Sequence, residues 1–292
     1  MATAVALSAG NGSIAAEQAP DDDHPASVSL VSELSAFHPG STQWIGVKFE
    51  LDDSWHIYWD GQNDTGMAPT VELDLPEGFS AGDIHWPTPH RYISPGGILD
   101  HVYEDEVTLL IPITIDNSVP ARGRATISAS LEWLVCAEVC IPGWGDSSIE
   151  LPLSRGGVEP GAGFASVHAA RSALTTPEPE TQQDFVTRWS GDRLAIIPTA
   201  RVERIAFYPG VGSLFVENLL GTGESGDRLS LPVDAEAEPI RSSAPGESPV
   251  LPKAVRGIVE IVRSPTAPPV RYSVVVPFPG SEHRSESGES GE

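Results

Sequence analysis

Apolar and polar residues alternate along short runs through much of the chain, which is the pattern of half-buried β-strands. In residues 44–51, for example, Ile45, Val47 and Phe49 are separated by Gly and Lys. Pro and Gly cluster between the runs and indicate turns. This spacing predicts a β-sandwich over residues 28–154. Its further strand-like runs are 70–75, 107–115, 125–135 and 147–153.

The second half of the chain resumes this pattern after an interruption. Residues 155–184 are rich in Gly and Pro and predict a linker, with a short helix at 164–174. We therefore expect a second, smaller β-rich domain at 185–279 and an all-β fold for the whole chain. The strand-like runs of this domain are 194–198, 204–208, 228–231, 255–262 and 272–276.

The two ends of the chain differ from both predicted domains. Residues 1–27 begin with small, mildly apolar residues without Lys or Arg and end in an acidic stretch. A secretory signal needs a basic start and a longer apolar run. We therefore expect a disordered tail or the remnant of a signal that starts upstream. Residues 280–292 are polar and rich in Glu, which predicts a disordered acidic tail.

Composition narrows the classes of function. Among 292 residues, 41 are acidic and 17 are Lys or Arg, which gives a net charge of −24. This charge disfavours binding to nucleic acid or to anionic membrane surfaces. No run of apolar residues is long enough for a transmembrane helix. Two cysteines cannot build a disulfide scaffold or a four-thiolate zinc site, but they can form one bridge.

The two cysteines, Cys136 and Cys140, follow a strand-like run. If the three residues between them turn the chain, the cysteines become cross-strand neighbours, with Cα atoms about 4.5–5.5 Å apart. That separation lies within the range that a disulfide requires. The strand before them places its apolar residues on one face and Cys136 on the other. These apolar residues are Ile127, Ala129, Leu131, Trp133 and Val135.

A bridge across so short a loop stabilises the fold by only about 2 kcal/mol. A domain of this size does not need that contribution. Exposed disulfides are more easily reduced than buried ones, so the pair is a candidate redox switch. An inert local disulfide, two reduced structural cysteines, and a metal site that uses both thiolates with a histidine remain as alternatives.

Three stretches carry a resemblance to a known family. The run 133–142 (WLVCAEVCIP) resembles the amino-terminal periplasmic domain of the DsbD family of thiol:disulfide reductases, especially its ScsB-like branch. Residues 55–59 (WHIYW) and 84–89 (IHWPTP) agree with this branch as well. The second half is similar through Phe-Tyr-Pro at 207–209. The resemblance covers residues 28–278.

The resemblance implies an immunoglobulin-like β-sandwich whose cysteine pair alternates between dithiol and disulfide in the periplasm. It implies a thioredoxin-like or membrane-embedded electron donor, and oxidised periplasmic proteins as acceptors. In the family a loop covers the cysteines, and by position this loop is 90–100 here. The full transporters continue into a membrane domain and a thioredoxin-like domain. This sequence contains neither, so we expect the cysteine pair to receive its electrons from another molecule. The sequence departs from the family pattern at two points, the short spacing of the cysteines and the run Gly61-Gln62-Asn63-Asp64.

Candidate chemistry therefore centres on Cys136 and Cys140 as the redox couple. Nearby carboxylates should raise the pKa of a thiol, because they disfavour a second negative charge. Glu138, between the cysteines, is a candidate proton acceptor or a solvated turn residue. Tyr92 in the covering loop and Trp144 after the hairpin are candidate pocket aromatics. We expect no cofactor and no metal, because the histidines lack ligand spacing and no glycine-rich phosphate loop is present.

The leading hypothesis is an extracytoplasmic thiol–disulfide exchange domain. Whether it is a protein-disulfide reductase or one component of an interchange pathway stays open. The alternative is a secreted β-sandwich binding module with a structural disulfide. A copper-handling domain, in which Cys136, Cys140 and one histidine hold Cu(I), is the weakest hypothesis.

Overall fold

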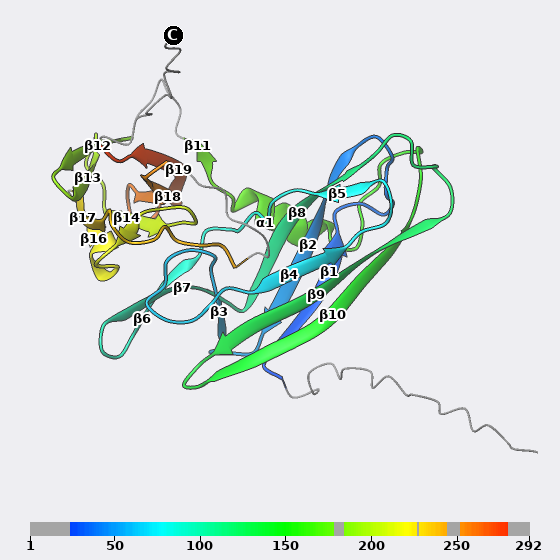
Figure 1. The fold of residues 1–292 in the computed structure, drawn as a ribbon, viewed down its shortest axis with the longest axis horizontal. Coiled ribbons are helices and arrows are strands. Elements are labelled where there is room, and N and C mark those ends of the chain that lie inside the picture. Colours follow the sequence, from blue (N-terminus) through cyan, green and yellow to red (C-terminus); the bar gives the residue numbers. More distant parts are fainter. Residues whose placement is uncertain (1–23, 178–183, 227, 244–251, 280–292) are drawn as a thin grey trace, which may run out of the picture.

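The structure of the chain is a computed structural model that describes residues 24–177, 184–226, 228–243 and 252–279. The predicted tails lie outside these ranges except for residues 24–27, of which 24 and 25 precede the first strand and 26 and 27 begin it. The fold is an immunoglobulin-like β-sandwich followed by a smaller β-rich domain, as predicted (Figure 1). Within the described ranges, no helix has the length and apolar character needed to span a membrane.

The first sandwich consists of two packed antiparallel sheets. One sheet has the order β1-β2-β8-β5, with bounds Ala26–Ser32, Thr42–Leu51, Glu106–Ile115 and Phe79–Ala81. The other has the order β10-β9-β3-β7-β6, with bounds Cys140–Pro152, Arg124–Cys136, His56–Tyr58, Ile98–Glu104 and His90–Ser94. The strand β4 (Thr70–Asp74) also pairs with β9.

The alternation in the sequence decides which side chains fill this sandwich. In β2, Ile45, Val47 and Phe49 are fully buried, and in β9, Ile127 and Leu131 face the same core. Because successive side chains of a strand point to opposite faces, the residues between them lie on the outer surfaces of the sheets. Each fully buried side chain of this size contributes about 1.5–3 kcal/mol.

A short helix, α1 (Phe164–Ser172), lies within the predicted linker and matches the helix expected at 164–174. It packs against the outer side of the first sheet. Val167 and Ala170 of the helix are buried and contact Leu110 of β8, with Trp44 beside them. Part of the predicted linker is therefore attached to the first sandwich.

The smaller domain also has two sheets and its own apolar core. One sheet has the order β11-β19-β18-β14-β16, with bounds Thr176–Pro177, Val270–Pro277, Ala254–Val262, Arg204–Pro209 and Gly223–Ser225. The other has the order β12-β13-β17-β15, with bounds Phe185–Ser190, Arg193–Pro198, Leu229–Asp234 and Phe215–Val216. A short 3-10 helix, η1 (Leu220–Thr222), follows β15.

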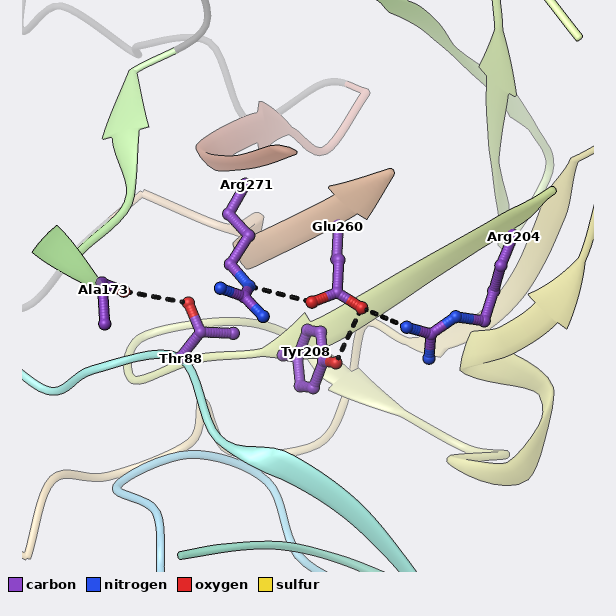
Figure 2. Close-up of polar contacts among 6 residues, drawn as sticks. All are labelled: Thr88, Ala173, Arg204, Tyr208, Glu260 and Arg271. Atoms are coloured by element: carbon purple, nitrogen blue, oxygen red, sulfur yellow. Dashed lines mark hydrogen bonds and ion pairs between the residues drawn. The ribbon is translucent and has the colours of Figure 1, made fainter. Parts of the chain in front are cut away.

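One carboxylate is buried in the smaller domain and is paired with two arginines (Figure 2). Glu260 in β18 is only 3% exposed. Its Oε1 atom lies 2.8 Å from Nη2 of Arg204, and its Oε2 atom lies 2.8 Å from Nε of Arg271. The Tyr208 hydroxyl lies 3.5 Å from Oε1 and donates to it. Burial, reinforced by Glu260, raises the pKa of Tyr208 to about 12, so this hydroxyl keeps its proton.

The two domains share a junction formed by residues 59–63. The amide side chain of Gln62, 4% exposed, donates to the Val216 carbonyl at 2.7 Å and accepts from the Val216 N–H at 2.9 Å. Gly61 forms an isolated bridge with Gly210. Tyr208 of the smaller domain belongs to the core of the first sandwich, where its ring centroid lies 6.5 Å from that of Trp59. The junction is therefore packed and hydrogen-bonded.

His101 in β7 makes the junction sensitive to pH. It is fully buried, and its Nδ1 atom donates to the Gln62 carbonyl at 2.7 Å. Burial lowers the pKa of His101 to about 4, so the folded protein holds a neutral ring while the unfolded chain protonates near pH 6.5. The resulting stability is present above pH 6.5 and is lost as the pH falls toward 4.

We expect the free energy of unfolding to fall by ~2 kcal/mol more in the wild type than in His101→Gln between pH 7.5 and pH 5. Urea unfolding at both pH values measures this difference. The two proteins are compared by how much the free energy of unfolding changes between the two pH values. Its absolute value is not compared, because the substitution also removes packing contacts. Equal changes in the two proteins would contradict the prediction.

Candidate functional site

The disulfide predicted from the cysteine spacing is present at the tip of the β9–β10 hairpin. Cys136 is the last residue of β9 and Cys140 is the first residue of β10, and the two are register partners. Their sulfur atoms are bonded at 2.02 Å, and their Cα atoms are 4.1 Å apart. The turn is closed by a hydrogen bond of 3.0 Å from the Ala137 N–H to the Val139 carbonyl.

The two cysteines differ sharply in exposure. Cys136 is 2% exposed and packs in a small apolar cluster with Tyr58 and Val102, which Tyr92 and Leu134 border. Cys140 is exposed to solvent. Of the two cysteines, Cys140 is therefore the one that an incoming thiolate can approach from solvent, whereas Cys136 lies within the domain.

Aromatic side chains from β3 and β6 line the buried side of the disulfide. His56 is 3% exposed and pairs with Cys136 across the sheet. Its ring centroid lies 4.7 Å from that of Tyr92 and 5.4 Å from that of Tyr58. Burial lowers the pKa of His56, while Glu104 and Asp100 oppose this shift. The imidazole is therefore neutral near pH 7.

The Tyr58 hydroxyl is the polar group that approaches the disulfide, with its oxygen 4.0 Å from Sγ of Cys140. Burial raises the pKa of Tyr58, and the Asp100 carboxylate raises it further. Asp100 is 4% exposed and accepts hydrogen bonds from the N–H and hydroxyl of Thr65 at 2.8 and 2.6 Å. Tyr58 thus stays a neutral phenol that can donate a hydrogen bond to sulfur.

The structure brings some of the predicted site residues together and leaves others apart. Tyr92 borders the apolar cluster around Cys136. Glu138 is exposed in the turn, and its role as proton acceptor stays a prediction. Trp144 is 47% exposed and lies four residues beyond Cys140, about 13 Å along the strand. Its role as a pocket residue also stays a prediction.

The segment expected to cover the cysteines as a loop, 90–100, forms most of the β6–β7 hairpin instead. The reason is the Pro-Gly-Gly turn: Gly96 and Gly97 have φ values of 100° and 80°, which glycine adopts without steric cost. The turn lets the two flanking strands pair from His90–Val102 to Ser94–Ile98. Figure 1 shows this hairpin and the tip of β9–β10 at the same end of the molecule.

Neither Tyr58 nor His56 was singled out as a site residue from the sequence. The alternation of side-chain direction along residues 55–59 would have identified them. Ile57 and Trp59 face the sandwich core, so His56 and Tyr58 must face the opposite side of the sheet. That side is the one on which Cys136 lies.

Comparison with known proteins gave the following matches. Residues 27–151 match the family described as Thiol:disulfide interchange protein DsbD, N-terminal. The N-terminal periplasmic domain of ScsB from Proteus mirabilis aligns with a TM-score of 0.52 at 19% identity, covering 89% of this chain and 96% of that chain. The reduced N-terminal domain of Neisseria meningitidis DsbD aligns with a TM-score of 0.26 at 19% identity, covering 46% and 90%. No curated protein sequence gave a significant match.

The similarity to the ScsB structure extends over both β-domains and shows a shared fold. The family match covers the strands that build the Cys136–Cys140 hairpin and the aromatic side chains behind it. The resemblance expected from the sequence is thus confirmed: residues 27–151 match the family of the DsbD N-terminal domain.

Proposed function

We propose that this protein performs thiol–disulfide exchange outside the cytoplasm, with Cys136 and Cys140 as its redox couple. The observation that carries the proposal is the unequal exposure of the two bonded cysteines at a hairpin tip. The match of residues 27–151 to the family of the DsbD N-terminal domain supports the same chemistry. An oxidised pair also fits an oxidising compartment such as the periplasm.

Reduction of the disulfide requires two steps. A donor thiolate attacks Sγ of Cys140, a bond forms between the donor and Cys140, and Cys136 leaves as a thiolate. A second donor thiolate then attacks the donor sulfur of this mixed disulfide, which releases the oxidised donor and a Cys140 thiolate. Two electrons have moved to the protein, and both thiolates take up protons. The reduced pair passes the electrons on by the reverse steps with an oxidised substrate protein.

The pocket supplies two groups to this chemistry. The Tyr58 hydroxyl, 4.0 Å from Sγ of Cys140, donates a hydrogen bond to the Cys140 thiolate as charge develops there. The neutral ring of His56, beside Cys136 in the sheet, adds no charge near the leaving sulfur. Glu138, exposed in the turn, is proposed to accept the proton that the donor thiol loses before its thiolate attacks Cys140.

We propose a thioredoxin-like protein or a membrane-embedded domain as the electron donor, and oxidised extracytoplasmic proteins as the acceptors. Exposed Cys140 suits a partner that presents its own thiolate at its surface. Val139, 64% exposed beside Cys140, offers an apolar contact to that partner.

The reduction potential of the pair tests the proposal. We expect the folded protein, equilibrated in buffers of defined glutathione ratio, to titrate as a two-electron couple at a potential above about −300 mV. Alkylation followed by mass spectrometry counts the free thiols at each potential, and circular dichroism checks that the reduced protein stays folded. A pair that remains oxidised below that potential would instead identify a structural bridge in a binding module.

A further inference from the structure

The β6–β7 hairpin has two faces with different neighbours. Adjacent side chains on β6 point to opposite sides of the strand. Tyr92 points toward the cysteine pair, where it contacts the ring of His56 at a centroid distance of 4.7 Å. Arg91 points away from the pocket, toward the smaller domain. The same short strand therefore links the redox pocket to the second domain.

The guanidinium of Arg91 is bound at the 3-10 helix η1. Its Nη2 atom donates to the Leu219 carbonyl at 3.3 Å and to the Leu220 carbonyl at 3.1 Å. It also lies flat against Gly223, because a Cβ atom added at Gly223 would be only 2.3 Å from Nη1 of Arg91. The turn of the hairpin approaches the same helix, since a Cβ added at Gly97 would lie 3.3 Å from Leu220.

The η1 segment that binds Arg91 is itself held in place by burial and hydrogen bonds. Leu219 is 2% exposed and Thr222 is fully buried, and the Thr222 hydroxyl donates to the Leu219 carbonyl at 2.7 Å. Three residues earlier, Val216 is hydrogen-bonded twice to Gln62 of the first domain. The carbonyls that receive Arg91 are thus fixed relative to the sandwich that carries the disulfide.

We propose that the smaller domain holds the β6–β7 hairpin over the cysteine pair through the contact of Arg91 with residues 219–223, which we call the brace. Arg91 is the positioning residue of this contact. With the hairpin in place, Cys136 stays in an apolar pocket, where burial disfavours the thiolate that must leave during reduction. Release of the hairpin admits water to Cys136 and speeds its departure. The second domain therefore sets the reactivity of the disulfide. This inference rests on the proposed function for its effect on redox rates.

The contact is tested from both sides with a double-mutant cycle. Arg91→Ala removes the guanidinium, and Gly223→Ala displaces it by occupying its place from the second domain without altering the hairpin. We expect each variant to speed reduction of the disulfide by excess dithiothreitol about fivefold, and the double variant to be no faster than either single one, because both break one interaction. Arg91→Lys, which retains a charged donor group, is expected to lie between Arg91→Ala and the wild type.

Hydrogen–deuterium exchange of the hairpin amides provides a readout that is independent of redox chemistry. We expect protection at 90–94 to fall about tenfold in Arg91→Ala and in Gly223→Ala, with the amides of β2 unchanged. The matched controls are Arg124→Ala, at an exposed arginine of β9, and Gly157→Ala, where an added Cβ meets no atom within 4 Å. Both controls should behave like the wild type.

Each outcome decides the proposal. Unchanged exchange in Arg91→Ala would overturn the brace, and faster exchange with an unchanged reduction rate would overturn its control of the disulfide. Additive effects in the double variant would show that the two residues act separately and would also overturn it. A wild-type disulfide that resists reduction at every potential would refute the proposed function, while the exchange data would still decide the brace.

Discussion

Replacing Cys136 by serine is expected to trap a covalent complex with a thioredoxin-like protein, whereas replacing Cys140 should lower the yield of that complex about 100-fold. The cause is access: Cys140 is exposed while Cys136 is 2% exposed. In Cys136→Ser the exposed thiolate forms a mixed disulfide that no second cysteine resolves. The measurement is a non-reducing gel with mass spectrometry, after mixing with a thioredoxin-like protein whose single remaining thiol carries a nitrothiobenzoate leaving group.

The two cysteine variants serve as controls for each other. Both lose the same disulfide, so any loss of stability from opening the short loop, about 2 kcal/mol, is common to both and is checked by urea unfolding. A difference in trapping therefore reports which sulfur is reached, rather than how well the variant folds. Equal yields from the two variants, or a higher yield from Cys140→Ser, would contradict the assignment of Cys140 as the attacked sulfur.

Replacing Glu260 by alanine is expected to lower the free energy of unfolding by about 3 kcal/mol, the lower end of the cost of breaking a buried ion pair. Arg204 and Arg271 would lose their shared carboxylate, and the Tyr208 hydroxyl would lose its acceptor. The cost stays at the lower end because the side chains of the two arginines are 41% and 29% exposed and can turn to water. Urea unfolding followed by tryptophan fluorescence measures the change.

The matched control is Glu150→Ala. Glu150 is also a strand glutamate paired with an arginine, Arg124, but both side chains are 55% exposed. Exposed pairs contribute about 0–1 kcal/mol, so this variant should unfold close to the wild type. If Glu260→Ala and Glu150→Ala lost the same stability, burial of the Glu260 carboxylate would not be the source of its contribution.

Local alternation was sufficient to predict the strands and the cysteine hairpin. In β9, every second residue from Ala125 to Val135 is buried, so the sequence pattern and the packing agree. The helix α1 was predicted at 164–174, between a Gly-rich and a Pro-rich segment. These features are encoded within a few residues, where side-chain direction follows directly from strand geometry.

The composition of the pocket was harder to predict, because it depends on pairing between distant strands. His56 lies beside Cys136 only because β3 pairs with β9, a contact between residues 80 positions apart. Gln62 sits in a stretch that reads as a polar turn, yet its amide is buried against Val216, 154 residues away. No local pattern distinguishes such an amide from a solvated one. Tyr92 borders the apolar cluster around Cys136 and lies within a hairpin rather than a loop; its role in the pocket stays a prediction.

The paired hydrogen bonds between Gln62 and Val216 also bear on how this protein can be engineered. A graft that carried only the first sandwich would lose both hydrogen bonds between Gln62 and Val216, each of which contributes about 0.5–1.5 kcal/mol. It would also uncover Trp59, which packs near Tyr208 in the intact chain. Chimeras that exchange redox domains between related proteins should therefore transfer both β-domains as a single cassette.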